Sequence, residues 1–267
     1  MTPTHPTETK PTALITGASR GIGLELAKHL AANGHDVVLS ARGRDALEAA
    51  AGVIEGKYGV NATVIPVDLR LPDASEHLHS EVAAQKIEIG ILVNNAGFGL
   101  GGEFLETDMQ REVEMIQVNV TALTQLTKLF AAAMVLRRDG RIMNVASTAA
   151  FQPGPLMAVY YATKAYVLSF TEAVAEELRD TGVTLTALCP GATATDFAET
   201  AQVTSSRLFT RLGVASPESV AAYGYKAMMR GERVAIPSFR DKIMIQSERF
   251  APRALVTRLA RLAQENR

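Results

Sequence analysis

Three polar side chains near the middle of the chain have the types and spacing of a proton-transfer site. Tyr160 and Lys164 stand four residues apart, so a helix over this stretch places them on one face. A tyrosine hydroxyl with an ordinary pKa of about 10 exchanges protons poorly near neutrality, and a neighbouring ammonium group lowers that pKa. Ser147 lies thirteen residues before Tyr160, directly after the run IMNVA at 142–146. Because the Ser147 hydroxyl could hold a substrate oxygen, we expect the three residues to act together on that oxygen.

A glycine-rich stretch near the N-terminus has the arrangement of a phosphate-binding turn. Gly17, Gly21 and Gly23 separate the apolar run ALIT at 13–16 from an amphipathic stretch. Gly17 permits a tight turn, Gly21 lets the backbone approach a phosphate, and Gly23 allows helix and strand to pack closely. The helix that begins there offers unpaired N–H groups and the positive end of its dipole. The spacing is not that of a P-loop, and in this position it predicts a pyrophosphate site.

The end of the next apolar run indicates which cofactor such a turn would hold. An acidic residue there would bond a ribose 2′-hydroxyl and repel a 2′-phosphate, but residues 39–44 (LSARGR) contain no carboxylate. Ser40 and Arg42 could bind a phosphate, and Arg20 in the glycine turn could approach it from the other side. We therefore expect NADP(H) in preference to NAD(H). The alternative is that Arg42 and Arg44 only begin a solvated helix. Asp68, after the third apolar run, could accept a hydrogen bond from an adenine amino group.

Short apolar runs and longer amphipathic stretches alternate along the chain. The runs predict strands at 13–16, 36–40, 62–67, 89–94, 141–146, 183–189 and 233–237. Helices are expected from about residues 21, 44, 72, 108, 157 and 216. Strands that are apolar throughout and separated by helices are typical of a parallel sheet covered on both faces. The predicted fold class is α/β, a doubly wound Rossmann fold in a single domain, with a seven-stranded parallel sheet and helices on both faces.

The two ends of the chain depart from this alternation. Residues 1–10 have no periodic apolar positions and no signal-like apolar core, so we expect a disordered tail before a Rossmann-fold catalytic domain at 11–237. Residues 238–267 interleave apolar side chains with arginines, which predicts an amphipathic helical segment. We expect this segment to pack on the domain or at a subunit interface; the alternative is that it lies on a membrane surface or covers an apolar entrance.

The composition argues against several classes of protein. With 27 Lys and Arg against 28 Asp and Glu, the chain has no basic field that would hold nucleic acid. The single cysteine, Cys189, excludes an intrachain disulfide framework and a cysteine-built metal site, and it is expected to be a small buried hydrophobe. We expect no metal. The longest apolar runs, such as 129–136, are too short to span a bilayer, so we expect a cytoplasmic protein.

Several motifs, in order along residues 12–236, resemble those of the short-chain dehydrogenase/reductase family, compact type. The resemblance rests on Thr16-Gly17 with Gly21-x-Gly23, Asn94-Asn95-Ala96-Gly97, Ser147, Tyr160-x-x-x-Lys164 and Pro190-Gly191-x-Thr193-x-Thr195. It implies an NAD(P)(H) oxidoreductase on a Rossmann fold, and the missing acid after the second strand is similar to the family's NADP-preferring members.

The resemblance also implies roles for individual residues. The implied catalytic tetrad is Asn119, Ser147, Tyr160 and Lys164. Family members use the asparagine to hold a water in a proton relay through the lysine, a role that spacing alone does not predict. The expected cofactor contacts are Gly17, Ser19, Arg20, Gly21, Ile22, Gly23, Ser40, Arg42, Asp68, Leu69, Asn95, Ala96, Gly97, Tyr160, Lys164, Pro190, Gly191, Thr193 and Thr195.

The residues that flank these motifs predict the kind of substrate. The expected pocket lining is apolar and consists of Phe98, Leu100, Phe151, Leu156, Met157, Tyr161 and Phe197. We therefore expect a hydrophobic ketone or aldehyde and the corresponding secondary alcohol, unless several of these side chains pack in the core instead. Hydride would pass between nicotinamide C4 and the carbonyl carbon, with Tyr160 as general acid or base. The loop at 197–213 is the expected lid.

Two further expectations concern alternatives and partners. A catalytically silent NADP(H)-binding sensor or interaction protein on the same fold is the alternative function, although it would not need Ser147, Tyr160 and Lys164 together. The resemblance also implies a homodimer or homotetramer, formed through the helices predicted at 108–136 and 157–179.

Overall fold

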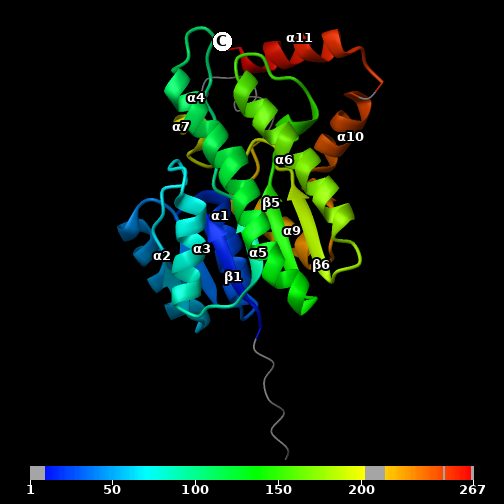
Figure 1. The fold of residues 1–267 in the computed structure, drawn as a ribbon. Coiled ribbons are helices and arrows are strands. Elements are labelled where there is room, and N and C mark those ends of the chain that lie inside the picture. The colour runs from blue at the N-terminus through cyan, green and yellow to red at the C-terminus, as the bar shows by residue number, and fades with distance from the viewer. Residues whose placement is uncertain (1–9, 202–213, 249, 266–267) are drawn as a thin grey trace, which may run out of the picture.

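The computed structural model describes residues 10–201, 214–248 and 250–265 (Figure 1). Apart from Lys10, the predicted tail at 1–10 lies outside these ranges, and so does the expected lid from residue 202 onwards.

Seven strands form one parallel sheet in the order β3-β2-β1-β4-β5-β6-β7, which confirms the predicted fold class. Their bounds are β1 Thr12–Thr16, β2 Val37–Ser40, β3 Ala62–Val64, β4 Ile89–Asn94, β5 Gly140–Val145, β6 Val183–Leu188 and β7 Val234–Ala235. β3 is shorter than predicted, although the N–H groups of Ile65 and Val67 still donate to the carbonyls of Leu39 and Ala41, both at 3.0 Å. The chain builds outward from β1 to β3 and then returns to place β4 on the other side of β1. This reversal opens a crevice at the carboxyl ends of β1 and β4, where such sheets bind ligands.

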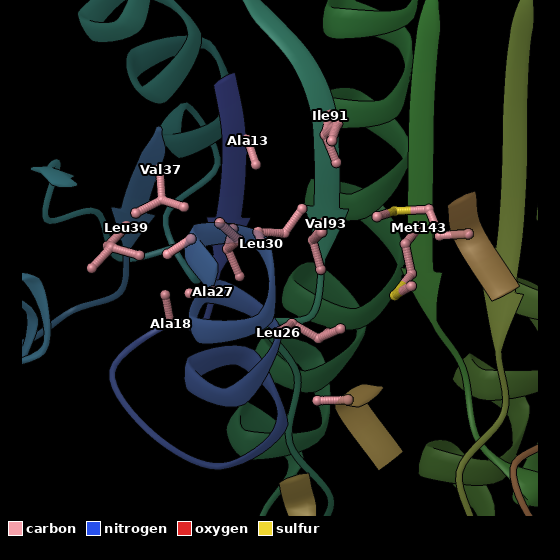
Figure 2. Packing of buried hydrophobic residues seen from close by; sticks show 14 of the residues in the cluster. Ala13, Ala18, Leu26, Ala27, Leu30, Val37, Leu39, Ile91, Val93 and Met143 are labelled. Carbon is pink, nitrogen blue, oxygen red and sulfur yellow. The ribbon is translucent and has the colours of Figure 1, made fainter. Parts of the chain in front are cut away.

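Helices cover both faces of the sheet. α1 Gly21–Ala32, α2 Arg44–Tyr58 and α9 Pro217–Met229 share one apolar cluster with alternate strand residues. Figure 2 shows Leu30 of α1 beside Val93 of β4 in this cluster. α3 Ala74–Ala84, α5 Leu123–Arg137 and α6 Ala158–Glu177 pack on the intervening residues, among them Leu14. Residues that alternate between two faces of a buried strand explain why the strands are apolar throughout.

One long helical stretch carries a local change of geometry. α4 Met109–Ile116 begins where the Asp108 side chain accepts a hydrogen bond from the Arg111 N–H at 2.8 Å, and it continues through a π-helical segment, Gln117–Ala122, into α5. Among the described residues, 109–137 is the helical stretch that is long and apolar enough to span a membrane. Its mean hydropathy reaches 1.3 over a window of 18 residues, and half of that window is buried inside the fold. Its apolar residues are spread along the helix, so consecutive apolar runs such as 129–136 did not indicate this length.

The C-terminal segment forms two further helices, α10 Phe239–Glu248 and α11 Arg253–Gln264. Ile245, Val256 and Ala260 are buried, and the Arg261 guanidinium pairs with Glu103 at 2.6 Å. Figure 1 shows α10 and α11 at the end of the molecule where α4 and α6 also begin. Two short elements complete the described part of the fold. A 3₁₀ turn, Thr148–Phe151, lies between β5 and α6, and α7, Phe197–Thr200, follows β6.

Candidate active site

A cavity of about 1270 Å³ lies at the carboxyl ends of the strands. Its walls come from the glycine turn, from the ends of β2, β4, β5 and β6, from α6, and from α10 and α11. Each residue expected to contact the cofactor lines this cavity except Gly23, and each residue of the implied tetrad does so except Asn119. The volume exceeds that of an ordinary small-ligand pocket, which suits a site that holds a dinucleotide and a substrate together.

The glycine turn has the backbone geometry that its sequence predicts. Gly17 and Gly21 adopt left-handed φ values of +66° and +58°, which favour glycine. A Cβ atom on Gly23 would overlap the Gly17 carbonyl oxygen and the Asn95 amide nitrogen. Gly23 does not line the cavity. Because it has no side chain, α1 can pack closely against the turn.

Asn95 braces this turn rather than only facing the cavity. Its Nδ2 donates hydrogen bonds to the carbonyl oxygens of Thr16 and Gly17, at 3.0 and 3.2 Å. The N–H groups of Asn95 and Ala96 both donate to Thr16 Oγ1 at 3.1 Å. The end of β4 thus holds the end of β1 in the shape that a pyrophosphate requires.

The end of β2 presents a polar atom that the described chain leaves unpaired. Ser40 is buried, its hydroxyl has no hydrogen-bond partner among the described residues, and it lines the cavity beside the exposed Arg42. A buried hydroxyl without a partner is costly, and a ligand phosphate next to an arginine would satisfy it. These residues therefore fit the 2′-phosphate of an NADP(H) cofactor.

Two other polar side chains expected at the cofactor already have protein partners. Arg20 pairs with Asp196 at 2.8 Å, which links the glycine turn to the loop after β6. The Asp68 carboxylate accepts from the Arg70 guanidinium at 2.6 Å, and this hydrogen bond lowers the pKa of Asp68. Arg70, which the sequence analysis did not single out, also lines the cavity.

The proton-transfer residues come together at the start of α6. Tyr160 and Lys164 are 8% and 6% exposed, and the Lys164 Nζ lies 5.9 Å from the centroid of the Tyr160 ring. Ser147 follows β5; its Oγ accepts from the Ala149 N–H at 3.1 Å and donates to the Pro190 carbonyl at 3.4 Å. One turn of helix and one strand end therefore bring the serine and tyrosine hydroxyls to the same wall.

The electrostatics of this pair differ from the expectation that Lys164 lowers the pKa of Tyr160. Burial raises the pKa of Tyr160 above its ordinary value, and the hydrogen bond with Ser147 opposes that shift. Burial also lowers the pKa of Lys164 to about 8, and its Nζ donates to the Val145 carbonyl at 2.7 Å. The chain alone leaves both groups in a poorly solvated wall, where the neutral forms are favoured.

Asn119 is buried behind this wall in the π-helical segment. Its amide exchanges hydrogen bonds with the Phe98 backbone, donating to O at 3.0 Å and accepting from N–H at 3.1 Å, and also donates to Thr163 Oγ1 at 3.1 Å. A Cβ atom on Gly97 would lie 2.9 Å from Asn119 Oδ1 and 3.5 Å from Lys164 Nζ. The glycine thus lets Asn119 and Lys164 approach the same point of the backbone. Thr163, which sequence reasoning missed, stands between Tyr160 and Lys164 in the recognised motif.

The loop after β6 closes the other side of the cavity. Pro190, Gly191, Thr193 and Thr195 line it, and Thr193 Oγ1 donates to the Gly191 carbonyl at 2.9 Å. A Cβ atom on Gly191 would come within 2.5 Å of Asp241 Oδ2 on α10. The loop and α10 therefore pack directly on each other.

The apolar part of the cavity contains four of the seven residues that the sequence predicted. Phe98, Met157, Tyr161 and Phe197 line it. The other three lie elsewhere. Leu100 packs beside the cluster of Met115 and Met157, the 3₁₀ turn directs Phe151 against Val167 and Leu168, and Leu156 has a left-handed φ of +66°.

Much of the remaining lining comes from α10, α11 and the residues between them. These residues are Arg240, Asp241, Met244, Ser247, Glu248, Ala251, Val256, Leu259, Ala260, Ala263 and Gln264. The sequence predicted mainly that this segment packs on the domain or a partner subunit, and a cover over an apolar entrance was the alternative. The amphipathic pattern predicts that such helices pack on something, but it does not specify the surface that they cover.

Neither a reactive thiol nor a metal cluster contributes to this site among the described residues. Cys189 is buried, and burial raises its pKa to about 12, so the thiol stays protonated. Among the described residues, no group of three or more His, Cys, Asp or Glu side chains could hold a metal ion.

Comparisons with known proteins agree with this geometry. A family model described as short chain dehydrogenase matches residues 11–205. The very-long-chain 3-oxoacyl-CoA reductase of Laccaria bicolor is 35% identical over 65% of this chain and 52% of its own length. The 17-beta-hydroxysteroid dehydrogenase type 3 of Mus musculus is 36% identical over 67% and 58%. The chain thus spans between half and two thirds of the length of these two curated relatives.

A solved structure extends the likeness to the whole fold. The short-chain dehydrogenase from Sphingobium yanoikuyae in complex with NADPH is 32% identical, with a TM-score of 0.81 over 90% of this chain and 94% of that one. With the glycine turn, the parallel sheet and the serine, tyrosine and lysine at one wall, the chain belongs to the short-chain dehydrogenase/reductase family.

Proposed function

We propose that the protein is an NADP(H)-dependent oxidoreductase that interconverts a carbonyl group and an alcohol on a hydrophobic ketone or aldehyde. The observation that carries this proposal is that Ser147, Tyr160 and Lys164 line the same cavity as the glycine turn. The names of the relatives, a reductase and dehydrogenases, support the reaction class.

The chain supplies binding and proton transfer. The glycine turn and the N-terminus of α1 would hold the pyrophosphate, with Ser40 and Arg42 at the 2′-phosphate. When bound, the nicotinamide supplies or accepts the hydride. Ser147 donates a hydrogen bond to the substrate oxygen and Tyr160 donates or takes its proton. Asn119 is a positioning residue, because it joins the backbone at Phe98 to α6 through Thr163.

The walls around this point support a hydrophobic substrate. Phe98, Met157 and Phe197 on the domain face Val256 and Ala260 of α11 across the cavity. Apolar surface of this kind gains free energy in proportion to the apolar area that the substrate removes from water. A small charged hydroxy acid would remove little apolar area from water, so it would gain little of this free energy.

The test is consumption of NADPH by the purified protein with a panel of apolar ketones and aldehydes. Tyr160→Phe should lower kcat by about a thousandfold or more, since general acid catalysis contributes factors of that order, while NADPH still binds. Tyr166→Phe is the matched control, because Tyr166 is an exposed tyrosine of the same helix outside the cavity lining. Turnover at the wild-type rate by Tyr160→Phe contradicts the proposal. NADPH binding with no turnover of any panel member supports the silent sensor instead.

The cellular location is a separate proposal. We propose a cytoplasmic protein, and the competing possibility is membrane association through α11, which exposes Leu255 and Leu262 beside its arginines. Sedimentation of the protein with vesicles of anionic lipid would decide for the membrane.

A further inference from the structure

We propose that a polar cluster in the roof of the cavity, formed by Tyr161, Glu248 and Gln264, binds a hydroxyl group on the part of the substrate remote from its carbonyl. The substrate class would then be a hydrophobic carbonyl compound that carries a second, distal hydroxyl. This inference rests on the proposed function for the identity of the reacting end. We call these three residues the roof cluster.

Gln264 gives the clearest indication of a ligand. It is 5% exposed, lies at the end of α11 and lines the cavity. Its Nε2 donates to the Tyr161 hydroxyl at 2.6 Å, but its Oε1 is buried with no hydrogen-bond partner among the described residues. A buried amide oxygen left unpaired in the wall of a cavity is costly in the absence of a ligand that donates to it.

Glu248 adds a second unpaired oxygen from a different helix. Its Oε2 is buried without a partner among the described residues, and the side chain lines the same cavity from α10. Burial raises the pKa of Glu248. The pKa of Tyr161 is raised first by burial and further by the charge of Glu248, while the Gln264 hydrogen bond opposes the shift. Glu248 lines the same cavity as Tyr161 and Gln264.

The chemistry of these groups selects a neutral donor. Both unpaired atoms are oxygens that accept hydrogen bonds, so an ether or a second carbonyl on the ligand would leave them unsatisfied. An ammonium group could pair with Glu248, but it has no lone pair with which to accept a hydrogen bond from the Tyr161 phenol. A hydroxyl can donate to either oxygen and can also accept from the Tyr161 phenol.

The position of the cluster defines which part of the substrate it would meet. Tyr161 follows Tyr160 on α6, and their ring centroids lie 6.1 Å apart at an interplanar angle of 77°. The Tyr160 ring also lies 5.1 Å from the Phe197 ring. The substrate would therefore place its carbonyl at Tyr160, pass apolar atoms along Phe197 and Met157, and reach the roof cluster with its distal hydroxyl.

The experiment measures ligand binding apart from turnover. The full-length protein, saturated with NADP⁺ so that ketones cannot be reduced, is titrated by calorimetry with 2-alkanones whose far end is a hydroxyl, a methoxy or a methyl group, over a series of chain lengths. We expect the hydroxyl ligand to bind about tenfold more tightly than the other two at the length that reaches the roof cluster. A parallel assay with NADPH reports turnover of the same compounds.

Variants assign the preference to the cluster. Gln264→Leu should bring the hydroxyl and methyl ligands to within about twofold of each other, because the amide acceptor is removed. Gln246→Leu makes the same change at an exposed position of α10 and should leave the preference intact. Because Gln264→Leu could also displace α11, Glu248→Gln provides a second test. It keeps the size of the side chain but replaces one acceptor oxygen by an NH₂ donor, so it should weaken the hydroxyl ligand selectively.

The outcomes separate this inference from the proposed function. Equal affinities for the three end groups, tighter binding of the methoxy ligand, or no binding at any chain length overturns the inference. A hydroxyl preference that Gln264→Leu and Glu248→Gln both leave unchanged also overturns it. A hydroxyl preference in binding with no oxidation of NADPH supports the roof cluster and contradicts the proposed reaction instead.

Discussion

Burial governs the protonation of the reactive residues before any ligand is present. Lys164 is surrounded by Val145, Cys189 and the backbone at Gly97, and its low exposure lowers its pKa to about 8. The same wall raises the pKa of Tyr160. In a poorly solvated wall, the charge that makes a tyrosine a usable acid must come from groups fixed close to it, including those of the bound ligands.

The pH dependence of stability tests the burial of Lys164. Its pKa is about 8 in the folded protein against an ordinary value of 10.5. Between these values the unfolded chain binds a proton that the folded protein lacks, so this lysine makes the free energy of unfolding rise with pH, by about 3 kcal/mol in all. Lys164→Met lacks this contribution. The difference in unfolding free energy between variant and wild type, measured with urea, should therefore shift by about 3 kcal/mol in favour of the wild type over that pH range.

Lys128→Met is the control for this measurement, since Lys128 is an exposed lysine on α5. A constant difference between wild type and Lys164→Met across the range would mean that Lys164 keeps its proton in the folded protein.

Cofactor selectivity is also decided at single residues. Arg42→Ala should raise the Kd of NADPH by about ten- to a hundredfold, because the 2′-phosphate loses a charged hydrogen-bond partner, and leave the Kd of NADH within about twofold. Arg44→Ala, which removes an arginine paired with Glu48 at 3.5 Å and outside the cavity lining, should change neither. Titration by nucleotide fluorescence measures both constants. Equal losses for the two cofactors in Arg42→Ala would remove Arg42 from the 2′-phosphate site.

At the scale of elements, close approach between backbones shapes the site. α1 reaches the end of β1 because Gly23 has no side chain, and the Asn95 amide fills the space beside it. The π-helical segment between α4 and α5 turns Asn119 towards Phe98 and Thr163. Single-turn π segments are frequent at functional sites because they re-aim one side chain without ending the helix.

Gly23→Ala tests this packing. The added methyl would overlap the Gly17 carbonyl oxygen, which the backbone of the turn holds in place. We expect a loss of about 1–3 kcal/mol in the free energy of unfolding and a weakened NADPH complex. Gly52→Ala, in α2, meets nothing within 4 Å and should stabilise the protein by about 0.5–1 kcal/mol through helix propensity, with unchanged NADPH affinity. Tight NADPH binding by Gly23→Ala would show that the turn does not hold the pyrophosphate.

At the scale of the whole molecule, the sheet and the C-terminal helices together make the cavity. The strand ends supply the polar half, and α10 and α11 close the apolar half, with Arg261 paired to Glu103 at the rim. Away from the cavity, α5 and α6 expose Leu136 and a Tyr166 ring that stacks on Phe170. Exposed apolar groups on neighbouring helices are typical of surfaces that bind another protein chain.

We predict that the protein forms a homodimer or homotetramer through α5 and α6. Light scattering should give at least twice the mass of the chain for the wild type and a smaller mass for Tyr166→Glu, because a charge in an apolar interface is costly. Leu105→Glu is the control, since Leu105 is 93% exposed on the loop before α4. A monomeric wild type would reject the prediction.

Local patterns in the sequence determined much of this protein. Three features are local patterns set by neighbours in the chain: the continuously apolar runs, the glycine turn and the Tyr160–Lys164 spacing. The α/β class, the seven parallel strands and the residues at the strand ends could therefore be predicted from them. The role of Asn119 needed either a family resemblance or the structure, because its partners, at Phe98 and Thr163, come together through packing.

Only the tertiary structure decided what α10 and α11 cover. Their amphipathic pattern predicts burial of one face, but a pattern contains no information on the surface that receives it. Packing on the cavity brought Gln264 to Tyr161 and Glu248 into the same lining. Packing also decided that Phe151 lies with Val167 and Leu168 and outside the lining that its position in the sequence suggested. The site's charges were likewise set by burial, which depends on all the elements around a residue at once, and therefore cannot be obtained from spacing along the chain.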